Sequence, residues 1–235
     1  MDQILSIESA IRTAQAEKKI CIALFIDLSK AYDSVWHKGL IFKLQQIGIK
    51  GHLLAWLKEY LQGRTFKVFF EGEYSVPRKI TTGVPQGAIL SPLLFNVMTR
   101  DIPKISGVTI SEFADDICFY IVGSGLPEIQ SKFQNQINVF YAWTKDWGLN
   151  VNINKTKAMM FTNKRTPYPP LSLNGSPIEY VRSHRYLGMF LDSPKLTWKD
   201  HIQKLADGCI SRVNILKMLS NPPLGSRSNH VTQSL

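Results

Sequence analysis

The sequence has few cysteines, and they form neither a metal-ligating nor a disulfide pattern. Its 235 residues contain three, Cys21, Cys118 and Cys209, with no Cys-x-x-Cys pair. An odd and widely spaced set argues against a zinc knuckle and against a disulfide framework. Cys21 and Cys118 lie in apolar, strand-like runs, where a free thiol acts as a small hydrophobe. We therefore expect no disulfide partner and a reducing, intracellular compartment, the nucleus or the cytoplasm.

Long apolar runs are also absent. No segment approaches the roughly 18 consecutive apolar residues that a transmembrane helix needs. The first residues lack the charged-then-apolar layout of a secretory signal. We find no internal repeat and no low-complexity tract. These absences predict a globular protein that does not bind a membrane.

Acidic residues are outnumbered by basic ones. The chain has 28 Lys and Arg against 18 Asp and Glu, which gives a formal net charge of +10. A basic surface favours polyanions through counterion release, so nucleic acid is the first partner to consider. Charge alone does not separate a nucleic-acid-binding protein from one that is merely basic. The 44% of hydrophobic residues supply enough material for a real core.

Hydrophobic periodicity predicts an α+β fold in which an antiparallel sheet packs on helices. The segments with a helical pattern are residues 3–17, 36–47, 52–61, 91–102, 126–147 and 198–219. Strands are expected at residues 21–28, 108–113, 117–122, 156–162 and 186–192, with a hairpin over 65–81 that turns at 71–73. Residues 163–177 read as a Pro-containing loop, and the stretch from Asn221 as a frayed end.

Two acidic positions stand out in this pattern. Asp27 ends a buried strand, and Asp115 and Asp116 occupy the tip of a tight hairpin. If the strands are neighbours, the three carboxylates meet at one sheet edge, where their repulsion raises their pKa values unless cations lie between them. Mg²⁺ suits such oxygen ligands, and two ions roughly 3.5–4 Å apart would clamp an in-line phosphoryl displacement. A single acid at a strand end is more often a turn former, so the hypothesis rests on the combination.

Five segments carry a family resemblance in order and spacing. They are FIDLSKAYDSV (25–35), GVPQGAILSPLLFNVMTRDI (83–102), FADD (113–116), GLNVNINKTKAMMF (148–161) and HRYLGMFLD (184–192). The set resembles motifs of reverse transcriptases, and the wording of the first two resembles non-LTR (LINE-type, jockey-like) retrotransposons of animals. The resemblance runs from about residue 3 to about residue 219. FADD alone is a weak signal, whereas five elements in order are a strong one.

The resemblance implies an RNA-directed DNA polymerase, a nucleotidyltransferase with a right-hand fold. Residues 1–196 would form the palm with residual fingers, and residues 197–235 the start of a thumb. Such an enzyme moves a nucleotide from a dNTP to a primer 3′-hydroxyl, with an RNA template, a DNA primer and two Mg²⁺ ions, for which Mn²⁺ is a possible substitute. Family members carry further fingers motifs upstream and an endonuclease domain, so the chain resembles an N-terminally truncated member.

The resemblance also implies roles for the acids and the residues after Asp27. Asp27 and Asp115 would be the main metal-binding aspartates, and Asp116 the supporting third acid. Leu28 would offer its backbone carbonyl to the second ion. Tyr32 would place its ring against a ribose 2′-hydroxyl and so exclude rNTPs; the alternative is simple core packing of an aromatic ring.

Further roles are implied for residues after the second motif. Gln86 and Gly87 would lie against the incoming nucleotide, although Pro-Gln-Gly by itself is an ordinary loop. Lys155 would neutralise or protonate the pyrophosphate, with Lys157 as a nearby competitor. Tyr186, Leu187 and Gly188 would form the hairpin that grips the primer end; the alternative is a plain sheet edge.

Two other functions stay open. The chain could be a related palm polymerase, either an RNA-dependent RNA polymerase or a group II intron maturase. Viral RNA polymerases typically show Gly-Asp-Asp, whereas this sequence has Ala-Asp-Asp, and Tyr32 favours deoxynucleotides. Maturases tend to differ in the residues around Asp27. The non-enzymatic alternative is a catalytically inactive, truncated remnant that still binds nucleic acid through its basic surface.

Overall fold

The computed structural model, which describes residues 2–220, is built around strand β1 (Ile20–Ile26). This strand is buried on both faces. Its even-numbered side chains pack in one hydrophobic core and its odd-numbered side chains in a second. Such double burial explains why the strand is apolar at every position. Burial also raises the pKa of the Cys21 thiol to about 12, as expected for an unreactive core cysteine.

Five strands form the main sheet in the order β11, β8, β1, β7, β6. The four partners in the sheet are β6 (Val108–Phe113), β7 (Asp116–Gly123), β8 (Lys157–Phe161) and β11 (Glu179–Tyr180). Neighbouring strands are antiparallel, except that β11 pairs with β8 in parallel. The expected antiparallel sheet is therefore confirmed, apart from this short edge strand.

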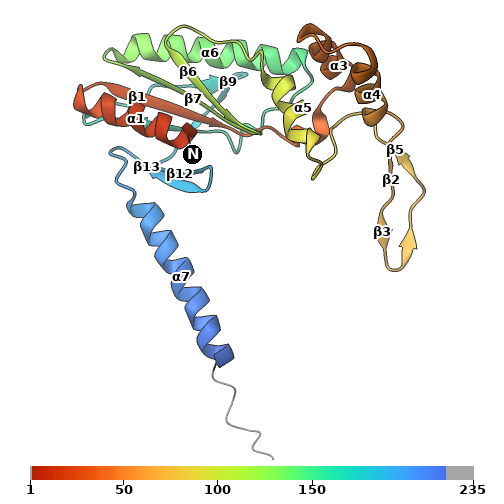
Figure 1. Cartoon of the computed structure of the whole chain (residues 1–235). Helices are drawn as coiled ribbons and strands as arrows, with labels where there is room; N and C mark the ends of the chain where they lie inside the picture. The colour runs from red at the N-terminus through yellow and green to blue at the C-terminus, as the bar shows by residue number, and fades with distance from the viewer. Residues whose placement is uncertain (1, 221–235) are drawn as a thin grey trace, which may run out of the picture.

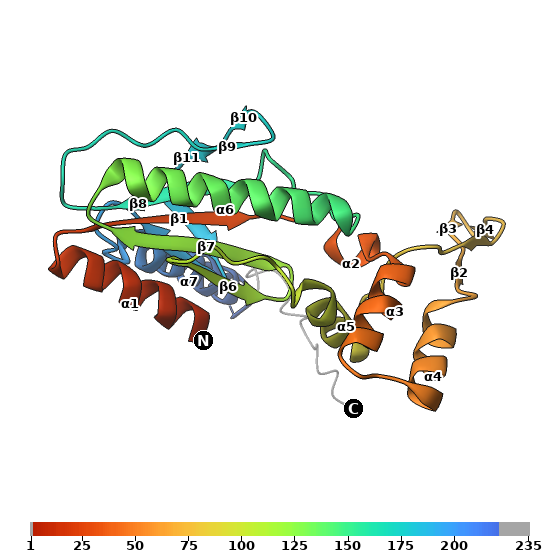
Figure 2. The ribbon, with the colours of Figure 1, turned by 90° about the horizontal axis from the view of Figure 1, so that it is seen from above.

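Helices cover the two faces of the sheet (Figure 1, Figure 2). Helix α6 (Leu126–Asp146) lies across one face and buries Phe133, Ile137 and Phe140 in the first core. Helix α1 (Asp2–Ala16) lies on the other face, where it buries Ile4, Ile7, Ile11 and Ala14 in the second core. The long helical periodicities of the sequence thus mark the two faces that close the core.

A cluster of shorter helices lies at the end of β1. It consists of α2 (Ala31–Ser34), α3 (His37–Gln46), α4 (Gly51–Leu61) and α5 (Leu90–Thr99). Lys43 of α3 is only 1% exposed, and its ammonium lies 2.5 Å from a carboxylate oxygen of Asp101 and 3.6 Å from the ring centre of Trp147. Burial lowers the pKa of Lys43, and the Asp101 carboxylate acts in the opposite direction. This buried cation links α3 to the end of α5 and to α6.

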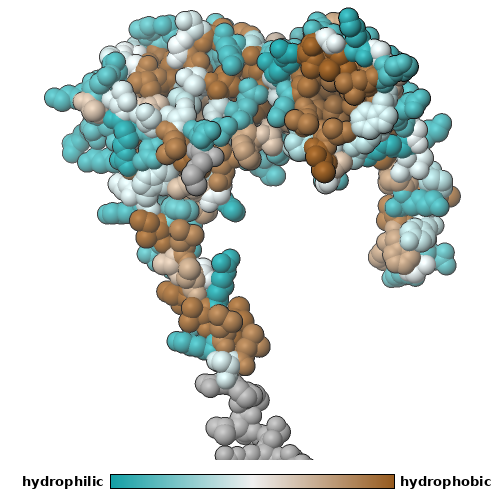
Figure 3. All heavy atoms as spheres, viewed as in Figure 1, coloured by the Kyte–Doolittle hydropathy of each residue, from teal (hydrophilic) through white to brown (hydrophobic). Residues whose placement is uncertain are grey.

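Two elements project from this body (Figure 1). One is a hairpin ribbon made of β2 (Thr65–Phe66), β3 (Phe69–Phe70), β4 (Glu73–Tyr74) and β5 (Arg78–Lys79). The other is α7 (Lys199–Ser220), which has no buried residue. Hydrophobic residues therefore reach the surface along both projections (Figure 3). None of the helices between residues 2 and 220 is long and apolar enough to cross a bilayer.

Most expected elements are present within a few residues of their predicted ends, with four differences, one of which is the edge strand β11, in a segment where no strand was expected. The strand expected at 186–192 is wrong, because Leu187 and Gly188 have positive φ values of 47° and 85° and turn the chain. The result is a hairpin of β12 (Ser183–Tyr186) and β13 (Met189–Asp192). The expected loop 163–177 contains the small hairpin of β9 (Ser172–Leu173) and β10 (Ser176–Pro177), and α2 was not foreseen. The frayed end predicted from Asn221 lies outside the described residues.

Candidate active site

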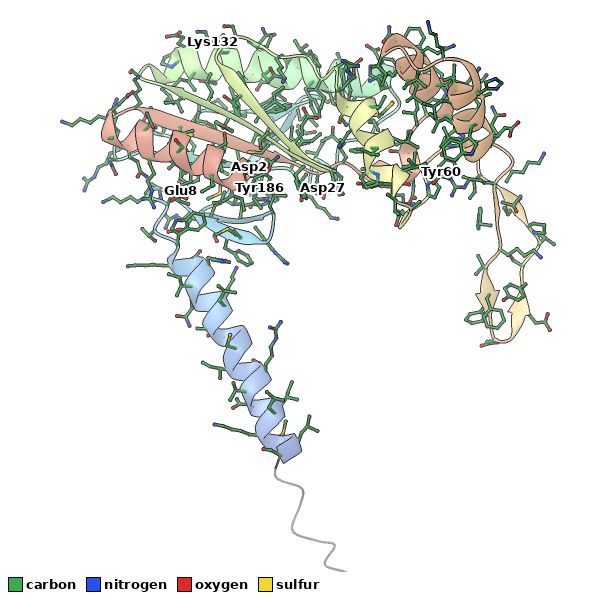
Figure 4. The ribbon with its side chains drawn as sticks, viewed as in Figure 1. Asp2, Glu8, Asp27, Tyr60, Lys132 and Tyr186 are labelled. Carbon is green, nitrogen blue, oxygen red and sulfur yellow. The ribbon has the colours of Figure 1, made fainter. Side chains whose placement is uncertain are left out.

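Asp27 directly follows β1, and hydrogen bonds to residues 150–156 hold its backbone and that of Ser29. Its carbonyl oxygen accepts from the backbone N–H of Asn152 at 2.7 Å, and the N–H of Ser29 donates to the Asn150 carbonyl at 2.7 Å. The Asp27 N–H also donates to the Thr156 hydroxyl at 3.4 Å. The fourth motif of the sequence therefore lies beside the first and fixes its backbone. Figure 4 shows Asp27 on the side of the body from which the ribbon and α7 project.

Strand register brings the other two acids to the same edge. Ile26 pairs with Ile117, so Asp27 and Asp116 are the next positions across the β1–β7 ladder. Phe113 pairs with Asp116 around a two-residue turn of Ala114 and Asp115. Ala114 has a left-handed φ of 56°, a strained backbone of the kind found at functional sites. Burial, then the charges of Asp115 and Asp27, raise the pKa of Asp116.

A cavity of about 850 Å³ opens at this edge. Its wall contains most of the residues that the sequence singled out: Asp27, Leu28, Tyr32, Gln86, Gly87, Asp115 and Lys155. These residues come from four of the five motifs, one of which, FADD, forms the β6–β7 turn, and only folding brings them together. The volume is that of a typical small-molecule site. The competitor Lys157 is placed differently, because its ammonium lies 2.5 Å from a Glu179 carboxylate oxygen.

Tyr32 forms one wall of the cavity. Its ring stacks on Phe95 of α5, with 5.0 Å between ring centres and 24° between planes. Burial and the nearby Asp115 carboxylate raise the pKa of the Tyr32 hydroxyl. The ring is therefore packed on α5 and also lines the cavity near Asp115, and the exclusion of a ribose 2′-hydroxyl by this ring stays a prediction.

The loop before α5 is fixed against the segment after β1. The N–H of Gly83 donates to the Val35 carbonyl and that of Val84 to the Tyr32 carbonyl, both at 2.8 Å. The side-chain amide of Gln86 donates to a carboxylate oxygen of Asp33 at 3.0 Å. Gly87 has a φ of 83° and no neighbouring atom within 4 Å of the position that a Cβ would take, so its backbone conformation rather than a close contact requires glycine.

A second, smaller cavity of about 380 Å³ adjoins the first and shares Asp27 and Lys155 with it. Asp116, Lys157, His184 and Tyr186 are among its other lining residues, and Figure 4 shows Tyr186 near Asp27. The Tyr186 hydroxyl lies 3.2 Å from that of Ser111. Burial, and then Lys157, lower the pKa of His184 to about 4, so this ring is neutral at neutral pH. Leu187 and Gly188 form the turn beyond Tyr186.

The acids offer ligands for a cation, although they do not form a complete site by themselves. In residues 2–220 no group of three or more acidic, histidine or cysteine side chains is arranged to hold a metal ion. Asp27 and Asp115 nevertheless line one cavity, and burial, followed by the charges of these two acids, raises the pKa of Asp116. Mg²⁺ is commonly bound by one or two carboxylates together with water and substrate phosphates. The donor set therefore fits such an ion with a substrate present.

Two features of the site were missed in the sequence. Asp33, the second acid of FIDLSKAYDSV, holds the amide of Gln86. Asn152, in the fourth motif, holds the backbone of Asp27. The only available signal was their place inside the motifs, because neither residue type predicts its partner across more than 50 residues of sequence.

Comparisons with known proteins agree with this arrangement. The family described as reverse transcriptase (RNA-dependent DNA polymerase) matches residues 1–191. The chain is 33% identical over 231 residues to a probable RNA-directed DNA polymerase from transposon BS of Drosophila melanogaster, which covers 94% of this chain and 25% of that protein. It is 30% identical over 214 residues to the RNA-directed DNA polymerase from mobile element jockey of Drosophila funebris, covering 88% and 23%. The chain thus spans about a quarter of the length of these relatives.

Among solved structures, a similar fold occurs in apo telomerase from Candida tropicalis, truncated from its C-terminal domain. The TM-score is 0.56 at 16% sequence identity, over 83% of this chain and 38% of that one. At this identity the likeness concerns the fold alone. It supports the right-hand polymerase architecture that the motifs predicted.

Proposed function

The chain belongs to the reverse transcriptase (RNA-dependent DNA polymerase) family, and we propose that its cavity catalyses RNA-directed DNA synthesis of the non-LTR retrotransposon type. The substrates would be an RNA template, a DNA primer and dNTPs. One observation carries the proposal: Asp27, Asp115, Tyr32, Gln86 and Lys155 line the same cavity. Residues 1–196 would be the palm with residual fingers, and residues 197–235 the start of the thumb. The three free cysteines, two of them buried and one exposed, fit a nuclear or cytoplasmic protein.

In the proposed reaction the primer 3′-oxygen attacks the α-phosphorus of the dNTP and pyrophosphate leaves. Asp27 and Asp115 would bind divalent cations, Mg²⁺ or Mn²⁺, with Asp116 and the Leu28 carbonyl in support. Two bound ions would supply charge stabilisation for the attacking and leaving oxygens. The protein contributes mainly position, because its acids are fixed by the sheet register and the Asn152 contact.

The remaining residues would bind and select the substrate. Lys155 would place its positive charge beside the pyrophosphate, and its cavity position favours it over Lys157. The stacked ring of Tyr32 would occupy the space that a ribose 2′-hydroxyl needs. Gln86 and Gly87 would contact the incoming nucleotide, and Tyr186, Leu187 and Gly188 would hold the primer end in the adjoining cavity.

Primer extension tests this function directly. The assay uses a poly(rA)/oligo(dT) template-primer with dTTP and Mg²⁺, and compares the wild-type chain with Asp115→Ala. Asp146→Asn, an exposed acid at the end of α6, is the matched control. We expect extension by the wild type and the control and none by Asp115→Ala. Salt-sensitive RNA binding that survives Asp115→Ala, with no extension by any protein, would instead support the inactive remnant. Equal use of rNTPs would support an RNA polymerase.

A further inference from the structure

The projecting ribbon exposes an unusual number of large apolar side chains. Its β2–β5 segment leaves Phe66, Val68, Phe69, Phe70, Tyr74 and Val76 between 49% and 69% exposed. The ribbon stands away from the sheet and its helices (Figure 1, Figure 2). A group of this kind on a surface marks an interaction site, because a solvated hairpin tip has no structural need for three phenylalanines.

The ribbon holds its aromatic rings in a defined arrangement. A two-residue turn of Glu71 and Gly72, with φ values of 50° and 88°, closes β3 on β4. Phe69 and Tyr74 are cross-strand partners with ring centres 4.8 Å apart. The Lys67 ammonium lies 6.0 Å from the centre of the Tyr74 ring. Rings and a cation therefore share one face of the ribbon.

Basic residues continue from the ribbon toward the body. A groove of about 570 Å³ lies at the base of the ribbon, and Arg64, Phe66 and Lys79 are among its lining residues. The groove also reaches Asp33 and Gln86. Gln86 is at the same time a wall residue of the larger cavity that holds Asp27. The groove therefore adjoins the candidate active site at Gln86.

The arrangement of the three cavities indicates which part of the template the groove would face. The 850 Å³ cavity shares Asp27 and Lys155 with the 380 Å³ cavity lined by Tyr186, whereas it shares Gln86 with the groove. The 850 Å³ cavity therefore lies between the other two. If the growing duplex leaves past Tyr186, the groove lies ahead of the copied base, where the template has no partner strand.

We propose that the groove and the ribbon bind the unpaired segment of the RNA template before it is copied. The inference rests on the proposed function and adds to it a surface for one partner. Arg64, Lys67, Arg78 and Lys79 would contact phosphates, and Phe66, Phe69 and Tyr74 would stack on bases. Proteins that bind single strands combine a basic groove with exposed aromatic rings in this way. Strand addition by a protein partner fits less well, because each ladder of the ribbon pairs only two residues per strand.

Equilibrium binding tests the proposal without requiring catalysis. Fluorescence anisotropy compares two template–primer duplexes of equal paired length, one with an overhang of about ten unpaired RNA template nucleotides and one blunt at that end. We expect the full chain to bind the overhang duplex about tenfold more tightly, the effect of one or two stacked bases. Phe69→Leu with Tyr74→Leu, and separately Arg64→Gln with Lys79→Gln, should each remove most of this preference and leave blunt-duplex affinity unchanged.

The leucine variants separate stacking from simple hydrophobicity, since they keep the apolar surface and remove the rings. Arg100→Gln with Lys145→Gln, two exposed cations outside the groove, is the matched charge control and should keep the preference. The proposal is overturned if the wild type binds both duplexes equally or if both ribbon variants keep the preference. Leucine variants that instead change the sedimentation of the free protein would assign the ribbon to a second copy of the chain. An intact preference without nucleotide addition would count against the proposed function alone.

Discussion

Gly83 lies so close to Asp33 that a Cβ added to it would be 2.7 Å from the Asp33 carbonyl oxygen. The contact joins the loop that carries Gln86 to the segment that carries Tyr32. Gly83 also has a φ of +87°, which disfavours any side chain. The close packing of the Gln86 loop on the Tyr32 segment therefore requires glycine at position 83.

Gly83→Ala is expected to lower the free energy of unfolding by about 2 kcal/mol or more, from left-handed strain and the backbone clash together. Urea denaturation measures the change. Gly107→Ala is the matched control, because Gly107 has a φ of +90° but no atom within 4 Å of the added Cβ. It should cost only about 1 kcal/mol. Equal losses in the two variants would show that the Asp33 contact is not tight in solution.

Tyr32→Ala should relax sugar selection. The ring is fixed on Phe95 at the cavity wall, so its removal opens space for a 2′-hydroxyl. The ratio of kcat/KM for rNTP to that for dNTP should rise by at least about tenfold. Tyr32→Phe keeps the ring and should leave the ratio unchanged. Undiminished discrimination in Tyr32→Ala would assign Tyr32 to core packing only.

Asp116→Asn is expected to reduce activity and yet to stabilise the protein at neutral pH. Burial and the Asp115 and Asp27 charges raise the pKa of Asp116 in the folded state. The native chain then binds this proton more tightly than the unfolded chain, so stability falls as pH rises from the ordinary carboxyl pKa through the raised value. Asp116→Asn has no carboxyl group at this position, so its stability should not decrease over this pH range.

Melting temperatures of the wild type and of Asp116→Asn, measured across this pH window, test the prediction. The two curves should meet at acidic pH and separate above it, whereas Asp146→Asn should follow the wild type. Adding Mg²⁺ at neutral pH should raise the melting temperature of the wild type more than that of Asp116→Asn. Parallel curves at every pH would mean that folding does not raise the pKa of Asp116.

The ion pair between the buried Lys43 and the exposed Asp101 should respond asymmetrically to substitution. Asp101→Ala leaves a nearly inaccessible cation without its carboxylate and should cost about 3 kcal/mol. Lys43→Met leaves an aspartate that is 42% exposed and still solvated, so it should stay within about 1 kcal/mol of the wild type. Chemical denaturation compares them, with Glu128→Ala of the exposed Lys132 pair as a control near zero. A larger loss of unfolding free energy in Lys43→Met than in Asp101→Ala would contradict this prediction.

The sequence by itself determined the elements and the chemistry of the site. An uninterrupted apolar run predicts β1 because a strand buried on both faces needs no polar positions. Asp27 at the end of that run and the two acids of the hairpin were visible as local features. The five motifs in order indicated the family, since motif wording is a property of the chain alone.

The tertiary structure alone decided which of these residues meet. The β1–β7 register, which joins residues about 90 positions apart, places Asp27 opposite Asp116. The hydrogen bond from Gln86 to Asp33, the burial of Lys43 and the split of 186–192 into a hairpin turn were not readable from local patterns. Periodicity reports whether a segment is buried, and the partner that buries it is chosen by packing across the whole fold.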